Sequence, residues 1–251
     1  MDKAIVTGAL GFLGFELCLA MLEEGLEVLA VDSKDETGER WLEVGRNSNI
    51  TYQPMHRQMP EKDYKASVFI NLYDYFTDKQ GETLEQISRF LEKNKTSFTD
   101  AVLLLPTVLS DRTGEVELSD FLSFLKEQSL ANHCSVYLPT LIGPKQPGSF
   151  LFQQLIFQSG EETEYVDDIR SAIYVKDAAR TILLNERNLE SFHLLSADKD
   201  SWKKSLGLLK KGETERGERQ TLIDIIPKRS NQVCVKPSLS FEDVMELQKK
   251  S

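Results

Sequence analysis

The stretch TGALGFLG, from Thr7 to Gly14, is the most informative part of this 251-residue chain. It follows a short apolar run that predicts a strand over Ala4 to Thr7, and it leads into a segment that predicts a helix over Phe12 to Glu24. A glycine-rich turn between a strand and a helix offers the free N–H groups and the partial positive charge of the helix N-terminus to an anion. The stretch therefore predicts a turn that binds phosphate groups.

Each of the three spaced glycines has its own predicted role. Gly8 permits the tight turn, Gly11 lets the backbone approach a pyrophosphate, and Gly14 lets the helix pack against the sheet. Asp32 ends the second predicted strand, 18 residues beyond Gly14, where a carboxylate accepts hydrogen bonds from an adenosine ribose and repels a 2′-phosphate. The pattern predicts a dinucleotide site that favours NAD over NADP, a preference that the nearby Lys34 weakens.

Apolar runs and amphipathic segments alternate over the first 140 or so residues. Continuously apolar strands that alternate with helices are typical of a parallel sheet covered on both faces. We therefore expect an α/β fold, a Rossmann-type doubly wound parallel sheet with a small C-terminal α/β portion. Beyond the first strand and helix, the predicted strands are Glu27–Val31, Ile50–Gln53, Ala66–Leu72, Ala101–Leu105 and Ser135–Leu138, and the predicted helices cover 82–93 and 118–130.

The pattern changes after Pro139, where Gly-Pro and Pro-Gly pairs mark a break. We expect a dinucleotide-binding domain over residues 1–147 and a small, shortened portion over 148–251, with residues 170–195 returning to the first domain. The second part is predicted to hold strands over Ser171–Val175, Phe192–Leu195 and Thr221–Ile226, helices over Lys176–Asn185 and Phe241–Lys249, and a solvated loop over 210–220.

Composition limits the classes of function. The net charge is −10 and no strongly basic run is present, which argues against a nucleic-acid partner. No apolar run reaches the roughly 20 residues that span a bilayer, so no membrane segment is expected. The three cysteines and three histidines lack the spacing of a metal site. The chain starts almost directly with a strand, so we expect no signal peptide and a cytoplasmic protein.

The spacing TGxxGFxG resembles the extended short-chain dehydrogenase/reductase family, and within it the NAD-dependent epimerase/dehydratase group that acts on nucleotide sugars. Further stretches are similar to that group in order along nearly the whole chain: SVFINL (67–72), SVYLPTLIGPKQ (135–146), DIRSAIYVKDAA (168–179), SFHLLSADKDSWKKSL (191–206) and KPSLSFEDV (236–244). The resemblance implies a nucleotide-sugar-like partner, leaves a homodimer through helix 118–130 open, and implies a cofactor site made of Thr7, Gly8, Gly11, Phe12, Leu13, Gly14, Asp32, Ser33 and Leu72.

The chain departs from this family at the catalytic positions. The family uses a Tyr as acid/base, a Lys four residues later on the same helix, and a Ser or Thr after the fifth strand. Here Thr107 follows the fifth predicted strand and Lys126 lies on the next helix, which leaves these two as candidate catalytic residues. Leu122 occupies the Tyr position, and no Tyr lies between Tyr75 and Tyr137. Because leucine cannot transfer a proton, the standard redox step is not expected.

Other polar residues have a less specific pattern. Tyr73, Asp74 and Tyr75 follow the fourth strand, at the edge where ligands bind in such sheets. The family prefers a small residue at the position of Tyr73, so its ring narrows the predicted site; packing or gating is the favoured role for both tyrosines, and a replacement acid/base is the alternative. Asp167 and Asp168 are adjacent on an extended segment and are not expected to converge.

Three hypotheses follow. The first is an NAD-binding protein of the epimerase/dehydratase-like group without the redox step, a pseudoenzyme that acts as a binding or regulatory module. The second is an active nucleotide-sugar epimerase, dehydratase or reductase with substituted catalytic residues. The third is an interaction protein with an empty cofactor cleft. The missing Tyr favours the first and third, and the glycines with Asp32 favour the first, because an unused site has no chemical need for that set.

Overall fold

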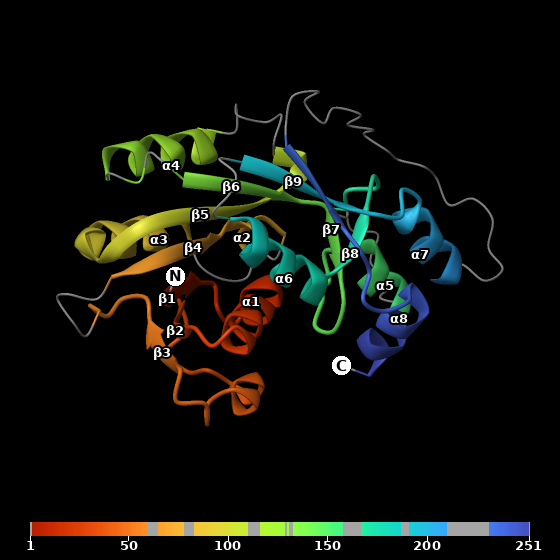
Figure 1. The fold of residues 1–251 in the computed structure, drawn as a ribbon, viewed down its shortest axis with the longest axis horizontal. Helices are drawn as coiled ribbons and strands as arrows, with labels where there is room; N and C mark the ends of the chain where they lie inside the picture. The colour runs from red at the N-terminus through yellow and green to blue at the C-terminus, as the bar shows by residue number, and fades with distance from the viewer. Residues whose placement is uncertain are drawn as a thin grey trace.

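A computed structural model describes residues 2–59, 65–77, 83–109, 116–128, 130, 133–157, 167–186, 191–209 and 231–250. Its main sheet has eight parallel strands in the order β10-β9-β6-β5-β4-β1-β2-β3 (Figure 1). The strand order reverses between β1 and β4, which makes the carboxyl ends of these two strands the switch point of the sheet. The strands are β1 (Lys3–Thr7), β2 (Glu27–Asp32), β3 (Ile50–Pro54), β4 (Ala66–Asn71), β5 (Phe98–Pro106), β6 (His133–Leu138), β9 (Ser191–Ser196) and β10 (Asn231–Val235).

Helices cover both faces of this sheet, which confirms the predicted doubly wound fold. Helices α1 (Phe12–Glu23) and α6 (Val175–Asn185) pack against each other on one face, and α3 (Leu84–Lys93) and α4 (Val116–Glu127) lie on the other. Successive residues of β1 enter opposite cores, since Ala4 and Val6 join the cluster under α1 whereas Ile5 joins the cluster under α3 and α4. Short 3-10 helices η1 (Glu39–Glu43), η2 (Lys95–Ser97) and η3 (Thr107–Leu109) connect the larger elements.

A short helix that the sequence pattern did not predict, α2 (Leu72–Thr77), continues directly from β4. The side-chain oxygen of Asn71 accepts a hydrogen bond from the backbone N–H of Asp74 at 3.2 Å and so caps the start of this helix. The predicted strand Ala66–Leu72 therefore ends one residue early. Because α2 begins at the switch point, its side chains lie where a ligand binds in sheets of this class.

The remaining elements gather at one end of the molecule, at the right in Figure 1. Strands β7 (Thr140–Ile142) and β8 (Ala172–Tyr174) form a separate two-stranded parallel sheet, accompanied by α5 (Leu151–Phe157), α7 (Ser201–Leu209) and α8 (Phe241–Lys249). The predicted strand over Ser171–Val175 thus pairs outside the main sheet, whereas β9 and the unpredicted β10 extend the main sheet itself. The strand predicted over Thr221–Ile226 and the loop over 210–220 lie outside the described residues.

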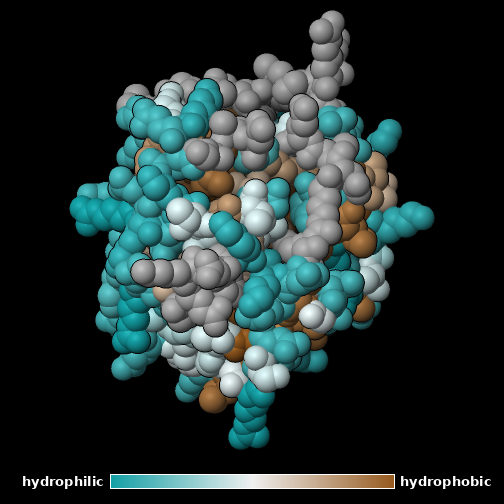
Figure 2. Space-filling model, turned by 60° about the vertical axis from the view of Figure 1, so that its left-hand side comes forward, coloured by the Kyte–Doolittle hydropathy of each residue, from teal (hydrophilic) through white to brown (hydrophobic). Residues whose placement is uncertain are grey.

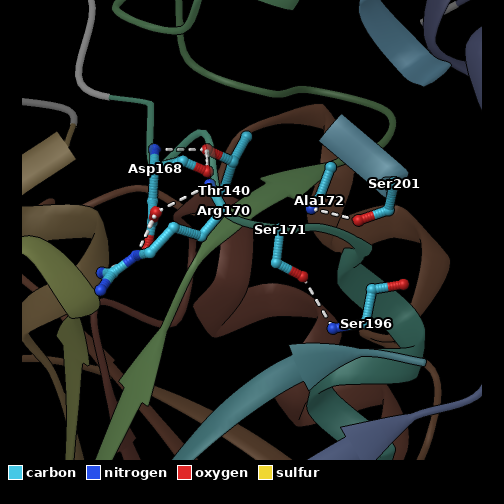
Figure 3. A network of polar contacts seen from close by, with 7 residues as sticks. All are labelled: Thr140, Asp168, Arg170, Ser171, Ala172, Ser196 and Ser201. Atoms are coloured by element: carbon cyan, nitrogen blue, oxygen red, sulfur yellow. Dashed lines mark hydrogen bonds and ion pairs between the residues drawn. The ribbon is translucent and has the colours of Figure 1, made fainter. Parts of the chain in front are cut away.

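A polar network ties the small sheet to its surroundings (Figure 3). The Asp168 N–H donates to the Thr140 hydroxyl at 2.7 Å, and the Asp168 carboxylate accepts two bonds of 2.8 Å from the Arg170 guanidinium. Asp167 instead accepts from the backbone N–H of Leu151 at 2.8 Å and from the Trp202 indole at 3.4 Å. The two adjacent carboxylates have separate partners, so the prediction that they do not converge is confirmed.

Two serines complete this network. The Ser171 hydroxyl accepts from the backbone N–H of Ser196 at 2.7 Å, and the Ser201 hydroxyl accepts from the backbone N–H of Ala172 at 2.9 Å (Figure 3). Both hydroxyls are buried, and each satisfies an amide that the irregular strand pairing leaves unpaired. The network therefore joins β8 to the end of β9 and to the first turn of α7.

Candidate dinucleotide site

The turn between β1 and α1 has the geometry that its glycines predict. Gly8 has φ +63°, which favours glycine, and the Gly11 N–H closes the turn on the Gly8 carbonyl at 3.0 Å. A Cβ placed on Gly14 would lie 2.0 Å from the Gly8 carbonyl oxygen. Gly14 is thus required by contact with the turn itself. The side chains of Phe12 and Leu13 are buried in the core below α1, so only their backbone faces the turn.

The carboxylate of Asp74, from helix α2, lies at the N-terminus of α1. Both of its oxygens accept from the Leu13 N–H, at 3.1 and 3.0 Å, and Oδ2 also accepts from the Gly14 N–H at 3.1 Å. The Asn71 side-chain amide donates to the same oxygen at 2.7 Å. A Cβ on Gly11 would lie only 2.4 Å from Oδ2. Gly11 therefore makes room for a carboxylate of the same chain.

This arrangement does not fit the pyrophosphate of a dinucleotide. The amides at the start of α1 are the groups that the sequence predicts to bind phosphate, and two of them already donate to Asp74. A phosphate oxygen on these amides would need the space of the Asp74 carboxylate and would meet its negative charge. The glycine turn is built as an anion site, and the anion in it is a side chain.

Asp32 also bonds to the turn. It is buried, and its Oδ2 accepts from the backbone N–H of Leu10 at 3.0 Å. Its Oδ1 has longer contacts of 3.4 Å with the Lys34 N–H and 3.5 Å with the Ser33 hydroxyl. The turn thus has a use for Asp32 and for its glycines without any ligand. This corrects the inference that an unused site has no chemical need for the set.

Two further residues of the predicted cofactor site have structural roles. The hydroxyl of Thr7 accepts from the Asn71 N–H at 3.1 Å and joins the ends of β1 and β4. The side chain of Leu72 is fully buried in the core under α3 and α4. Both lie at the switch point, as predicted, but neither side chain faces an open cleft.

Tyr73, also on α2, packs against the segment that follows β6. It is buried, its hydroxyl donates to the Pro139 carbonyl at 2.9 Å, and it accepts from the Leu141 N–H at 3.0 Å. Its ring stacks on Phe150, with the ring centroids 6.2 Å apart. Burial raises the pKa of Tyr73 well above its usual value. These contacts support the packing role and not a replacement acid/base, which needs a pKa near the working pH.

Tyr75 is the other tyrosine at this edge. Its hydroxyl donates to Glu117 at 3.4 Å, and partial burial together with the Glu117 charge raises its pKa. A tyrosine that acts as a base needs a neighbouring cation to lower its pKa. Tyr75 has a carboxylate in that place.

The structure does not bring the two candidate catalytic residues together. Thr107 is buried at the carboxyl end of β5, and its hydroxyl has no hydrogen-bond partner among the described residues. Lys126 is exposed in the last turn of α4, shortly before β6 begins. Because β5 and β6 are parallel, α4 returns from the carboxyl edge of the sheet to its amino edge. Lys126 therefore lies at the edge opposite Thr107, and Leu122 packs against the core between them.

A partly buried ion pair near the turn was not predicted. Arg40 of η1 donates to Glu16 of α1 at 2.8 Å and to the Gly11 carbonyl at 3.2 Å, and its guanidinium lies 4.0 Å from the centre of the Phe15 ring. Burial raises the pKa of Glu16, while the Arg40 charge opposes that shift. The pair links residues 24 positions apart, a spacing that carries no local pattern. Asp74 was more accessible to prediction, since an acidic residue follows a strand that ends at the switch point.

Comparison with known proteins places the fold. No protein-family model matches the chain, and no curated protein matches its sequence. The structure is similar to UDP-glucuronic acid 4-epimerase from Bacillus cereus in complex with UDP-glucuronic acid and NAD, with a TM-score of 0.62 and 16% identity over 99% of this chain and 98% of that one. It is also similar to dTDP-glucose 4,6-dehydratase from Bacillus anthracis in complex with NAD, with a TM-score of 0.58 and 12% identity over 100% and 96% of the two chains.

A yeast methylglyoxal/isovaleraldehyde reductase complexed with NADPH is similar over 76% of this chain and 75% of that chain, with a TM-score of 0.54 and 16% identity. These neighbours therefore include proteins that hold NAD and one that holds NADPH. At these identities the likeness shows a common fold: that of the NAD-dependent nucleotide-sugar epimerases and dehydratases. Within the described ranges, no helix is long and apolar enough to cross a membrane, and no three metal-ligating side chains gather.

Proposed function

We propose that this chain is a non-redox protein with the fold of the nucleotide-sugar epimerases and dehydratases, which acts as a binding or regulatory module. The observation that carries the proposal is the separation of Thr107 from Lys126, with Leu122 in place of the tyrosine. The two tyrosines at the carboxyl edge do not replace it, because the pKa of each is raised. Of these described residues, neither tyrosine, nor Thr107 with Lys126, is suited to proton transfer with a hydride step.

Two of the three hypotheses are non-redox: an NAD-binding module and an interaction protein with an empty cofactor cleft. The Asp74 contacts favour the interaction protein. The position of Asp32 at the end of β2 makes NAD, rather than NADP, the dinucleotide that the cleft favours when it admits one. A nucleotide-sugar-like molecule remains the small partner that the fold suggests, in view of the UDP-glucuronic acid in the epimerase neighbour. We expect NAD to bind with a dissociation constant above about 1 mM, which corresponds to a favourable binding free energy of less than about 4 kcal/mol.

The homodimer and the cytoplasmic location stay predictions. Phe121 and Leu125, on the apolar side of the helix through which a homodimer was left open, are buried in the core under α3 and α4. The face of the molecule in Figure 2 is mostly hydrophilic, and where its residues are described the hydrophobic ones form small, separate areas. That face gives a second copy no broad apolar surface.

The proposal is tested by incubating the purified chain with NAD and, in turn, UDP-glucuronic acid, UDP-glucose and dTDP-glucose. We expect no epimerised or dehydrated product by chromatography and no NADH absorbance. Turnover near 1 s⁻¹, within the ordinary range of enzymes, would contradict the proposal. If turnover appears, the variants Thr107→Val and Lys126→Ala show whether either residue supports it, and Lys204→Ala, on an exposed lysine far along the chain, is the matched control.

A further inference from the structure

We infer that Asp74 is a built-in occupant of the phosphate subsite, and that helix α2, which carries it, closes the dinucleotide cleft as a strap. This inference rests on the proposed function, because it concerns the same dinucleotide cleft in the same fold. Redox turnover and occupancy of the cleft are measured separately, so either can fail alone.

The Asp74 carboxylate and the N-terminus of α1 satisfy each other. The carboxylate is buried and accepts from two backbone amides and from the Asn71 amide. The first N–H groups of a helix have no partner within the helix, and its dipole favours a negative charge there. Residues 60 and 61 positions apart are joined by these bonds. A ligand phosphate that took the amides would leave a buried carboxylate without its donors.

The charges next to Asp74 also oppose a second anion. Arg40, whose charge reaches Asp74, is already paired with Glu16. A pyrophosphate would add further negative charge next to the Asp74 carboxylate. The carboxylate therefore competes with the pyrophosphate both for space and for charge.

The second anchor of α2 lies on the other side of the switch point. The Tyr73 hydroxyl binds the backbone at Pro139 and Leu141, and the Tyr73 ring packs on Phe150. The Thr77 hydroxyl donates to the Tyr73 carbonyl at 2.8 Å, and the Ser149 hydroxyl donates to the Thr77 carbonyl. Asp74 thus ties the strap to α1, and Tyr73 and Thr77 tie it to the segment after β6. A dinucleotide that crosses the ends of β1 and β4 has to displace both anchors.

The test is calorimetric titration of the full chain with NAD and, separately, with inorganic pyrophosphate. The proteins are the wild type, Asp74→Ala, and the pair Tyr73→Ala with Asp74→Ala. Asp177→Ala is the matched control, because Asp177 is a buried carboxylate that accepts a backbone N–H, from Ser238 at 2.9 Å, outside the cleft. We expect Asp74→Ala to bind pyrophosphate at least about 10-fold more tightly than the wild type, a factor of about 1.4 kcal/mol. The double variant is expected to gain further affinity for NAD, and the control to gain none.

Equal affinity of the wild type and Asp74→Ala for pyrophosphate, whether tight or undetectable, would overturn the inference. So would an equal gain in Asp177→Ala. If Asp74→Ala does not fold, Asp74→Asn, which keeps the shape and removes the charge, takes its place in the same comparison, with folding checked by circular dichroism. Turnover assays on the same proteins test the proposed function separately. An active wild type whose subsite is filled by Asp74 would contradict the proposed function alone. An inactive wild type whose subsite is open to pyrophosphate would contradict this inference alone.

Discussion

The turn between β1 and α1 and the segment from β5 to α4 hold the two halves of the site that the family resemblance implies, and they differ sharply. In the turn, the glycines and Asp32 lie as the sequence predicts, but they bind Asp74 and the turn itself. In the second region, Thr107 and Lys126 lie at opposite edges of the sheet. The turn residues therefore have a use in packing that does not depend on a ligand, whereas Thr107 and Lys126 have no such mutual contact.

Substitution of Gly14 should have the largest effect on stability, and it tests whether packing in the turn between β1 and α1 requires a glycine. A Cβ there lies 2.0 Å from the Gly8 carbonyl oxygen, so Gly14→Ala is expected to lower the free energy of unfolding by about 3 kcal/mol or more. Denaturant unfolding measures it. Gly148→Ala is the control, since a Cβ there meets nothing within 4 Å. A cost below about 1 kcal/mol at Gly14 would show that the turn is not tightly packed.

Asp74→Ala should lower the free energy of unfolding by about 2 kcal/mol, because the amides of Leu13 and Gly14 lose their buried acceptor. The variant is therefore expected to be less stable and yet to bind pyrophosphate better. Thermal melts with and without pyrophosphate measure both effects on one sample. A variant as stable as the wild type would mean that the carboxylate does not hold the helix N-terminus.

Asp167 provides a second carboxylate, partly buried, which accepts from the Leu151 N–H and the Trp202 indole. Burial, the largest influence, raises its pKa from 3.8 to about 7. A raised carboxylate pKa means that the folded state holds the proton more tightly, so its stabilising contribution is present below pH 4 and lost as the pH rises to about 7. Asp167→Asn, which keeps an acceptor for the Leu151 N–H, should reduce this loss by about 1–2 kcal/mol. Unchanged pH dependence in urea unfolding between pH 5 and 8 would contradict the assignment.

Gly11 and Asp74 should be energetically coupled. A Cβ on Gly11 would lie 2.4 Å from the Asp74 carboxylate, so Gly11→Ala is expected to cost about 1 kcal/mol less in the Asp74→Ala background than in the wild type. A double-mutant cycle of unfolding free energies measures the coupling. If the two changes are strictly additive, contact with Asp74 does not explain the glycine at position 11, and a bound ligand becomes the explanation again.

Lys126→Ala should have the smallest effect on stability, and it tests whether Lys126 takes part in a binding site. The side chain is exposed at the amino edge of the sheet, so the change in the free energy of unfolding should stay within about 0.5 kcal/mol. NAD and nucleotide-sugar binding should not change either. A loss of binding in Lys126→Ala, compared with Lys204→Ala, would place this lysine in the site after all.

Much of the fold was predictable from the sequence, because apolar runs and turn glycines report on local periodicity. The main strands before residue 140 and the helices on both faces follow these patterns. The short elements β7, α5 and β10 did not, since they depend on partners distant in sequence, as the network of Thr140 with Asp168 shows. Helix α2 was missed because Leu72 extends the apolar run of β4 past the single polar residue Asn71.

The candidate site was predictable only in part. The residues of the turn were found from their spacing, but the identity of the anion was not, because Asp74 lies some 60 positions from the amides it accepts from. Tyr73 was expected to narrow the cleft because a bulky side chain stands where a small one is usual, and the structure shows it buried against Phe150. The edge on which Lys126 lies follows from the length of α4, which sequence periodicity does not fix.

The amide signals of Leu13 and Gly14 report directly on whether Asp74 or a dinucleotide occupies the N-terminus of α1. These two N–H groups are assigned in the nitrogen–proton NMR spectrum of the wild type and of Asp74→Ala, and both proteins are titrated with NAD. We expect that in the wild type neither signal moves at NAD concentrations up to about 1 mM, and that in Asp74→Ala both signals move and saturate. Movement in the wild type that saturates below about 100 μM would contradict this expectation, because the dinucleotide would then hold the amides that Asp74 is said to occupy.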